Sequence, residues 1–216
     1  MNDLSRPDKK QMRRSFDRAA SGYDRAAVLQ REVCMRALER LDLVKLDPAT
    51  IVDAGCGTGF AAQSLRKRFA RAHLIGLDIA PAMLHAARAR IPRWKKWMGL
   101  QAQAFVCGDN ERLPIRSASV DMLWSNLAFQ WAGDLGAVFA ECRRVLRPGG
   151  LLMFTTFGPD TLKELRAASA GDGMIHVNRF IDMHDIGDMM VGAGFADPVM
   201  EMEILTLTYT DVRSLM

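Results

Sequence analysis

The chain has 216 residues, of which 49% are hydrophobic and 25% are charged, and its formal net charge is +4 at pH 7. This length fits one domain, or one domain with an appendage, and this composition excludes a disordered chain. No apolar run approaches the ~20 residues that span a membrane, and the first residues lack the apolar core of a signal peptide. The four cysteines are far apart and have no histidine at ligand spacing. We therefore expect reduced cysteines, no metal site, no membrane contact and a cytoplasmic protein.

The excess positive charge lies in two stretches, one with Arg66, Lys67, Arg68 and Arg71, the other with Arg88, Arg90, Arg93, Lys95 and Lys96. Such stretches are either solvated helix faces or a docking surface for an acidic partner. That partner would be nucleic acid or an acidic carrier protein. Aromatic residues do not alternate with the basic ones, as they do on surfaces that stack bases, so we expect no nucleic acid.

The first part of the chain is predicted to be helical. The helical region is 9–47, with a break at 20–24. From Leu29 to Leu43 apolar residues lie three and four positions apart, and Pro48 ends the pattern.

Strands and helices then alternate along the chain. Strands are expected at 51–54, 72–78, 104–107, 120–125 and 151–157, and helices at 61–69, 82–89, 135–145, 160–168 and 182–193. The sequence Pro148-Gly149-Gly150 predicts a turn before the fifth strand, and residues 199–208 predict a sixth strand. Because parallel neighbours need a crossover between them, this order predicts an α/β fold. Its central, mostly parallel sheet has helices on both faces.

A glycine-rich turn follows the first predicted strand. The run Ile-Val-Asp-Ala-Gly-Cys-Gly-Thr-Gly at 51–59 places Gly55, Gly57 and Gly59 at alternate positions. Glycine tolerates positive φ and has no side chain, so a ligand can approach this backbone closely. Alone, the pattern also fits an ordinary tight turn.

Three acidic residues occur where successive strands are expected to end: Asp53, Asp78 and Asp109. In an open α/β sheet, ligands bind outside the carboxyl ends of the strands. An acid about 20 residues after the glycine turn suits two ribose hydroxyls. The third acid, next to Asn110, suits the amino group of adenine. Each acid alone could be a helix cap or a turn residue, but all three in register indicate a site.

Four motifs resemble class I S-adenosylmethionine-dependent methyltransferases, at residues 52–59, 76–84, 108–114 and 145–150. The resemblance implies a Rossmann-like fold and S-adenosylmethionine as cofactor. The fingerprint G-x-G-x-x-G of dehydrogenases is absent, which makes NAD the weaker candidate. The family implies cofactor contacts from the glycines and the acids, with Asp78 at the ribose, Asp109 and Asn110 at the adenine, and Ser125 and Asn126 under the transferred methyl group.

The flanking segments 15–24, 124–131, 154–166 and 178–185 resemble the malonyl-[acyl-carrier protein] O-methyltransferases of biotin synthesis. That resemblance implies methylation of the free carboxyl of a malonyl thioester, carried by acyl carrier protein or by coenzyme A. It also divides the chain into a helical lid or substrate segment at 1–48 and a cofactor-binding methyltransferase domain at 49–216. We expect a monomer.

A carboxyl substrate needs little catalytic equipment. With a pKa near ~4 it is already ionised at neutral pH, so no general base is required. A dry pocket favours its reaction with a sulfonium, because the two charges cancel. Arg179 is the candidate for orienting the carboxylate through its guanidinium fork, or else it pairs with Asp182 or Asp185. Tyr23, on the lid, is the second candidate, or else it packs. Phe129 and Trp131 wall the pocket or belong to the core.

The chain departs from the family at its end. The family has a seventh, antiparallel strand between the fifth and sixth, but this sequence stops at Met216. We expect that strand to be missing and the domain to be incomplete at its C-terminus, unless the sheet edge is covered in another way.

Two alternative functions stay open. One is a related methyltransferase for another small acid or a quinone precursor. The other is a non-methylating or arginine-modifying factor, because 157–166 also resembles respiratory complex I assembly factors.

Overall fold

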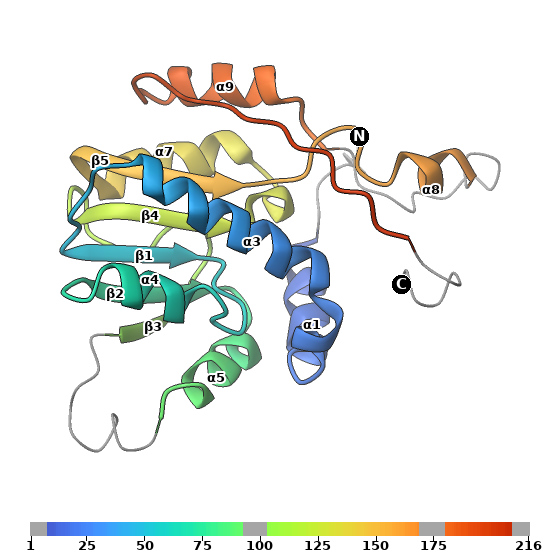
Figure 1. The fold of residues 1–216 in the computed structure, drawn as a ribbon, viewed down its shortest axis with the longest axis horizontal. Helices are drawn as coiled ribbons and strands as arrows, with labels where there is room; N and C mark the ends of the chain where they lie inside the picture. The colour runs from blue at the N-terminus through green and yellow to red at the C-terminus, as the bar shows by residue number, and fades with distance from the viewer. Residues whose placement is uncertain (1–7, 93–102, 169–179, 209–216) are drawn as a thin grey trace.

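A parallel sheet forms the centre of the computed structural model, which describes residues 8–92, 103–168 and 180–208 (Figure 1). The described strands are β1 (Thr50–Ala54), β2 (His73–Asp78), β3 (Gln103–Cys107), β4 (Val120–Asn126) and β5 (Leu146–Thr155). They pair in the order β3-β2-β1-β4-β5, and every pair is parallel. The α/β prediction is confirmed. Strand order reverses between β1 and β4, and such a reversal opens a crevice for ligands at the carboxyl ends.

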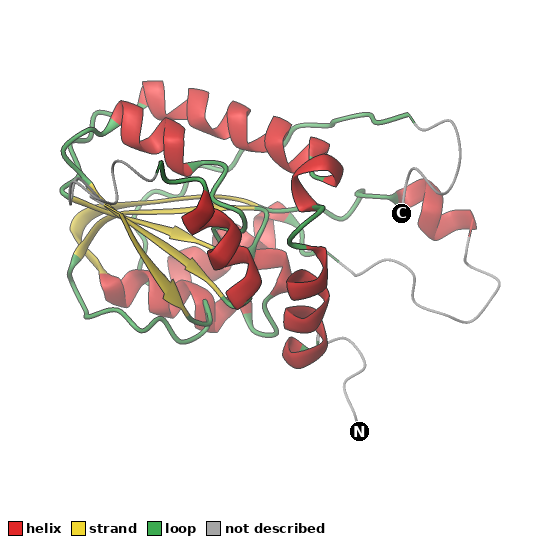
Figure 2. Ribbon diagram, turned by 90° about the horizontal axis from the view of Figure 1, so that it is seen from below, coloured by secondary structure: helices red, strands yellow, loops and turns green. Residues whose placement is uncertain are grey.

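Helices cover both faces of the sheet, as Figure 2 shows. The described helices are α1 (Lys9–Ala19), α2 (Tyr23–Ala26), α3 (Val28–Arg40), α4 (Ala62–Arg68), α5 (Pro81–Ala89), α7 (Leu135–Val145), α8 (Lys163–Ala168) and α9 (Met183–Gly192), with short 3-10 turns η1 (Leu41–Leu43) and η2 (Phe129–Trp131). No helix in the described ranges is long and apolar enough to cross a bilayer.

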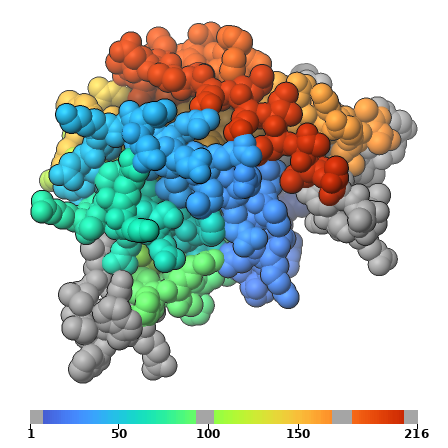
Figure 3. All heavy atoms as spheres, in the orientation of Figure 1, coloured from blue at the N-terminus to red at the C-terminus, as the bar shows by residue number. Residues whose placement is uncertain are grey.

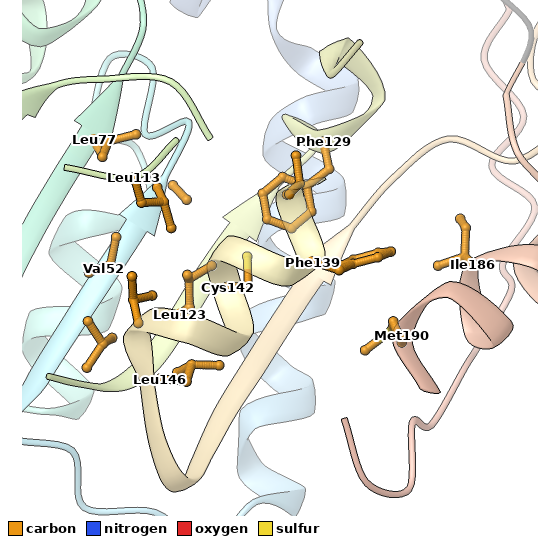
Figure 4. Packing of buried hydrophobic residues seen from close by; sticks show 14 residues of the cluster. Val52, Leu77, Leu113, Leu123, Phe129, Phe139, Cys142, Leu146, Ile186 and Met190 are labelled. Atoms are coloured by element: carbon orange, nitrogen blue, oxygen red, sulfur yellow. The ribbon is translucent and has the colours of Figure 1, made fainter. Parts of the chain in front are cut away.

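Alternate residues of the central strands point into two separate cores. On one face, Val52 of β1 and Leu123 of β4 pack with α7 and α9, and Figure 4 shows this cluster. On the other face, Ile51 and Trp124 pack with α3 and α4. Strands buried on both faces read as continuous apolar runs, which is why β1 and β4 were predictable. Each fully buried Leu, Ile or Phe contributes about 1.5–3 kcal/mol to this packing.

The predicted turn at Pro148-Gly149-Gly150 lies inside β5. Val120 of β4 pairs with Leu146, whereas Met122, two residues later, pairs with Leu151. The extra residues of β5 bulge out of the ladder, and Gly149 has a φ of 75° that glycine tolerates. The prediction of a separate turn before the strand is therefore wrong, and β5 begins at Leu146 rather than at residue 151.

The predicted sixth strand at 199–208 is wrong. These residues are described without strand pairing, and Val199 and Ile204 are 93% and 78% exposed. A strand needs a hydrogen-bonded neighbour, and no described segment pairs with the outer edge of β5. The segment instead runs past α3 (Figure 1), where Glu201 accepts hydrogen bonds from Arg40 at 2.6 and 2.8 Å and Glu203 pairs with Arg36.

Candidate active site

A cavity lies at the carboxyl ends of the strands, on the side toward which the arrowheads point in Figure 1. Loops after β1, β2, β3 and β4 form its floor, and α1 and α2 form its cover. Its lining residues are Lys9, Met12, Phe16, Tyr23, Gly55, Gly57, Asp78, Ile79, Met83, Gly108, Asp109, Asn110, Glu111, Asn126, Leu127, Ala128, Trp131 and Ala132. Of the acids and amides predicted at separate strand ends, Asp78, Asp109, Asn110 and Asn126 therefore meet in one place.

The glycine-rich turn requires glycine at its closest approach to the neighbouring loop. Gly55 has a φ of 78°, and a Cβ there would lie 2.2 Å from the Cβ of Ala128. Gly57 has a φ of 51° and faces open space in the cavity. Gly59, with a φ of 77°, packs against Ala87 and is not among the lining residues. The turn leaves backbone exposed to a ligand at Gly55 and Gly57.

Asp78 organises the turn as well as lining the cavity. Its carboxylate oxygens accept hydrogen bonds from the backbone nitrogens of Gly57 at 2.8 Å and Ala80 at 2.9 Å. Burial raises the pKa of Asp78, and these backbone hydrogen bonds oppose the rise. A carboxylate has about four acceptor sites, more than these hydrogen bonds use, so Asp78 can still accept from a ribose hydroxyl.

Asp53 lies behind the cavity rather than in its lining. It is only 3% exposed, and burial, aided by the negative charge of Asp78, raises its pKa to about 7. Ser125 is also buried, and its hydroxyl donates to the carbonyl of Ala54 at 2.8 Å, which ties β4 to β1. Asn126 does line the cavity, but its amide groups bond Gln30 and Thr155. Of the pair predicted under the methyl group, only Asn126 faces the cavity.

The loop after β3 offers the acceptors that an adenine amino group needs. One oxygen of Asp109 accepts from the backbone nitrogen of Glu111 at 3.0 Å, and the other contacts Lys9 at 2.6 Å. The side-chain oxygen of Asn110 is buried and has no partner among the described residues. Because Asn110 lines the cavity, this acceptor is placed to receive a hydrogen bond from a bound ligand. These residues fit S-adenosylmethionine.

The N-terminal segment contacts the chain that follows each of the four strands β1 to β4. Lys9 contacts the loop after β3, Asp17 accepts a hydrogen bond from the backbone nitrogen of Ala82 at the start of α5, and Asp24 accepts one from Thr58 in the glycine turn at 2.6 Å. Phe16 packs edge-on against Trp131 with 5.5 Å between ring centroids.

The predicted lid residues take separate positions. Tyr23 lines the cavity, and burial, followed by the charges of Asp78 and Asp24, raises its pKa. Trp131 also lines the cavity, whereas Phe129 is buried in the core with α7. Arg179 lies outside the described residues.

Sequence reasoning missed two charged lining residues, Lys9 and Glu111. Lys9 shares a helical face with Met12 and Phe16, three and seven positions later, and that spacing was the available signal. Glu111 contacts Lys9 at 2.7 Å and accepts a hydrogen bond from the backbone nitrogen of Gly133 at 2.6 Å. Glu111 lies within the motif at 108–114, but no neighbouring residue in the sequence indicates that it contacts Lys9 and Gly133.

The comparisons with known proteins agree with this geometry. Residues 52–154 match the family model described as a methyltransferase domain. The solved phosphoethanolamine N-methyltransferase 2 of Haemonchus contortus, in complex with S-adenosyl-L-methionine, has a TM-score of 0.61 and 20% identity, covering 76% of this chain and 36% of that one. The fold and the site define a class I methyltransferase, and S-adenosylmethionine is its methyl donor.

Two curated relatives cover almost the whole chain. The malonyl-[acyl-carrier protein] O-methyltransferase of Gallionella capsiferriformans is 58% identical over 210 residues, 97% of this chain and 72% of that protein. The protein of the same name from Laribacter hongkongensis is 55% identical over 219 residues, 100% of this chain and 74% of that protein. The chain belongs to the malonyl-[acyl-carrier protein] O-methyltransferase family.

Proposed function

We propose that this enzyme methylates the free carboxyl of a malonyl thioester carried by acyl carrier protein, an early step of biotin synthesis. One observation carries the proposal: the alignment at 58% identity spans 97% of the chain, and so includes the N-terminal cover of the cavity as well as the cofactor loops. Malonyl-coenzyme A is the alternative carrier. In this proposal the enzyme is a cytoplasmic monomer, and residues 1–48 act as its lid.

The loops of the cavity hold the cofactor in this proposal. S-adenosylmethionine supplies a methyl group on a positively charged sulfur when it is bound. Because Gly55 and Gly57 have no side chains, the cofactor can approach their backbone closely. Asp78 accepts hydrogen bonds from the ribose hydroxyls of the cofactor. Asp109 and Asn110 accept from its adenine amino group. Asp53, Gly59 and Ser125 support these loops from behind the lining.

The cover of the cavity serves the substrate. Met12, Phe16 and Trp131 exclude water from an ionised carboxylate, which makes its reaction with a cation more favourable. Because the pKa of Tyr23 is raised, its phenol stays protonated and can donate a hydrogen bond to that carboxylate or to the carboxyl group of the cofactor. Asn126 lies on the methyl side, and Arg179 orients the malonyl carboxylate through a bidentate pair.

The direct test is incubation with methyl-labelled cofactor and malonyl-carrier protein, followed by mass analysis of the acyl group. The expected result is one added methyl ester and no label on acetyl-carrier protein, which lacks the free carboxyl. If malonyl-carrier protein gains no labelled methyl group, the proposal is overturned. Label on another small acid, a quinone precursor or a protein arginine would replace it with one of the two alternatives.

Arg179→Ala separates substrate binding from cofactor binding. Loss of a charge-assisted bidentate pair predicts a rise of roughly tenfold or more in the KM for malonyl-carrier protein. The dissociation constant of the cofactor should stay within about twofold, because the same variant touches no proposed cofactor contact. Equal losses in both quantities would contradict the role given to Arg179.

A further inference from the structure

The outward side of the N-terminal cover is basic and uncovered. We name its exposed cations the basic lid face: Lys10, Arg13, Arg14, Arg18 and Arg25. Figure 3 shows the atoms of this segment, in the deepest blue, at the surface beside α5. Within the described residues, the side chains of Lys10, Arg14 and Arg25 form no ion pair or hydrogen bond. Arg18 contacts only Ser15 there, and Arg13 lies 3.9 Å from Asp17.

The acids of the same segment are committed to other contacts. Asp8 caps α1 by accepting from the backbone nitrogens of Lys10 and Gln11. Asp17 points inward to Ala82, and Asp24 bonds Thr58 and Arg90. Five exposed cations therefore stand against three acids in this segment, and one of those acids, Asp24, is already paired with Arg90 outside it. A surface of one sign attracts a partner of the opposite sign and speeds their encounter.

The position of this face distinguishes it from the basic stretches noticed in the sequence. Arg66, Lys67 and Arg68 form the last turn of α4, which leads into the start of β2, so they lie at the amino-end edge of the sheet. Arg88, in the last turn of α5, is held against Phe105. The basic lid face lies on α1 and α2, the two helices whose inner residues line the cavity.

We propose that the basic lid face is the docking surface for an acidic acyl carrier protein. This inference rests on the proposed function. A carrier delivers its acyl group on a covalent arm, so it must dock beside the cavity that receives the acyl group. Charge complementarity selects the lid over the opposite edge, because of these two surfaces the lid borders the cavity and also carries cations without ion-pair partners among the described residues. Docking there would also press α1 onto the loops that it contacts.

The test compares two double variants, each reversing two exposed charges. Lys10→Glu with Arg14→Glu alters the lid, and Lys67→Glu with Arg71→Glu alters the opposite edge as a matched control. Each is assayed with malonyl-carrier protein and with malonyl-pantetheine, which carries the same thioester without the protein. The lid variant should raise the KM for malonyl-carrier protein about tenfold or more, and added salt should shrink that difference.

Three KM values should stay within about twofold of those of the unaltered enzyme: that of the lid variant for malonyl-pantetheine and those of the control variant for both substrates. An unchanged KM in the lid variant would overturn the docking surface. An equal loss on malonyl-pantetheine, or an equal rise in the control, would overturn it too. If the unaltered enzyme methylates malonyl-pantetheine but not malonyl-carrier protein, the docking surface is overturned, whereas methylation of a malonyl carboxyl is supported. If it methylates neither substrate, the proposed function fails.

Discussion

The ammonium nitrogen of Lys9 lies 2.6 Å from a carboxylate oxygen of Asp109, 100 positions further along the chain. The same nitrogen lies 2.7 Å from Glu111. Burial lowers the pKa of Lys9, but the hydrogen bonds and charges of the two acids outweigh burial and raise it. A single cation thus holds the first turn of α1 against the loop after β3, next to the proposed adenine position.

Lys9→Met should loosen this end of the lid. Partly exposed ion pairs contribute about 0.2–1 kcal/mol each, so the loss of two predicts roughly fivefold faster exchange of the α1 amides. Hydrogen exchange followed by mass spectrometry on the cofactor-free enzyme measures this directly. Lys10→Met is the matched control, because Lys10 makes no ion pair within the described part of the chain. Equal exchange in the two variants would refute a holding role for Lys9.

Asp78→Asn should weaken cofactor binding by about tenfold or more. The amide lacks the negative charge of the carboxylate, and one of its two end groups can no longer accept hydrogen bonds from the glycine turn or from the ribose. Titration calorimetry with S-adenosylmethionine measures the change. Asp121 provides a control of the same chemistry at the opposite edge, since its carboxylate accepts from the backbone nitrogens of Ala49 and Thr50 at 3.0 and 2.8 Å. Asp121→Asn should leave the affinity within about twofold; an equal loss would indicate a general loosening of the fold.

The fold was predictable where local pattern decides it. The continuous apolar runs of β1 and β4 are buried on both faces, so their strands follow from the sequence alone. Residues 199–208 also carry apolar residues, but a strand requires a neighbour as well, and the sequence does not reveal that no segment in the described ranges pairs with the outer edge of β5. The bulge in β5 was missed for a related reason, because Pro148 and Gly149 indicate a turn whether or not pairing continues around it.

The site was predictable where strand ends decide it. Asp78 and Asp109 follow successive parallel strands, so topology alone brings them together. Lys9 reaches the same place from a helix a hundred residues away, and only packing determines that approach. The hydrogen bond from the Ser125 hydroxyl to the carbonyl of Ala54 on the neighbouring strand was likewise unpredictable, because a residue at a strand end can turn to the cavity or to the next strand, and packing decides between them.

Gly55→Ala should destabilise the enzyme more than a positive φ alone explains. Alanine at φ near 78° costs about 1–2 kcal/mol, and its Cβ would also meet Ala128 at 2.2 Å. Gly149→Ala isolates the first effect, because Gly149 has a φ of 75° and no atom within 4 Å of its added Cβ. Urea unfolding should show a loss for Gly55→Ala at least about 1 kcal/mol larger than for Gly149→Ala. Equal losses would mean that the loop after β4 shifts freely.

The buried carboxyl of Asp53 gives stability a predictable dependence on pH. Its pKa is about 7 in the folded chain, above the value of 3.8 expected when it is exposed. The folded state therefore binds more protons than the unfolded state in this window, and the free energy of unfolding falls as pH rises. The stabilisation is complete below pH about 4 and is lost as pH rises through about 7. Burial of Asp78 adds a change of the same sign.

Asp53→Asn removes the Asp53 share of this dependence, because the amide stays neutral at every pH. Relative to the unaltered enzyme, the variant should gain a few kcal/mol, at most about 4, in the free energy of unfolding between pH 4 and pH 8. Urea unfolding of the cofactor-free proteins at several pH values measures the difference, in which groups common to both cancel. If the difference in the free energy of unfolding between the two proteins stays constant across this pH range, Asp53 ionises as readily in the folded chain as in water. Water would then reach its carboxyl group behind the glycine turn.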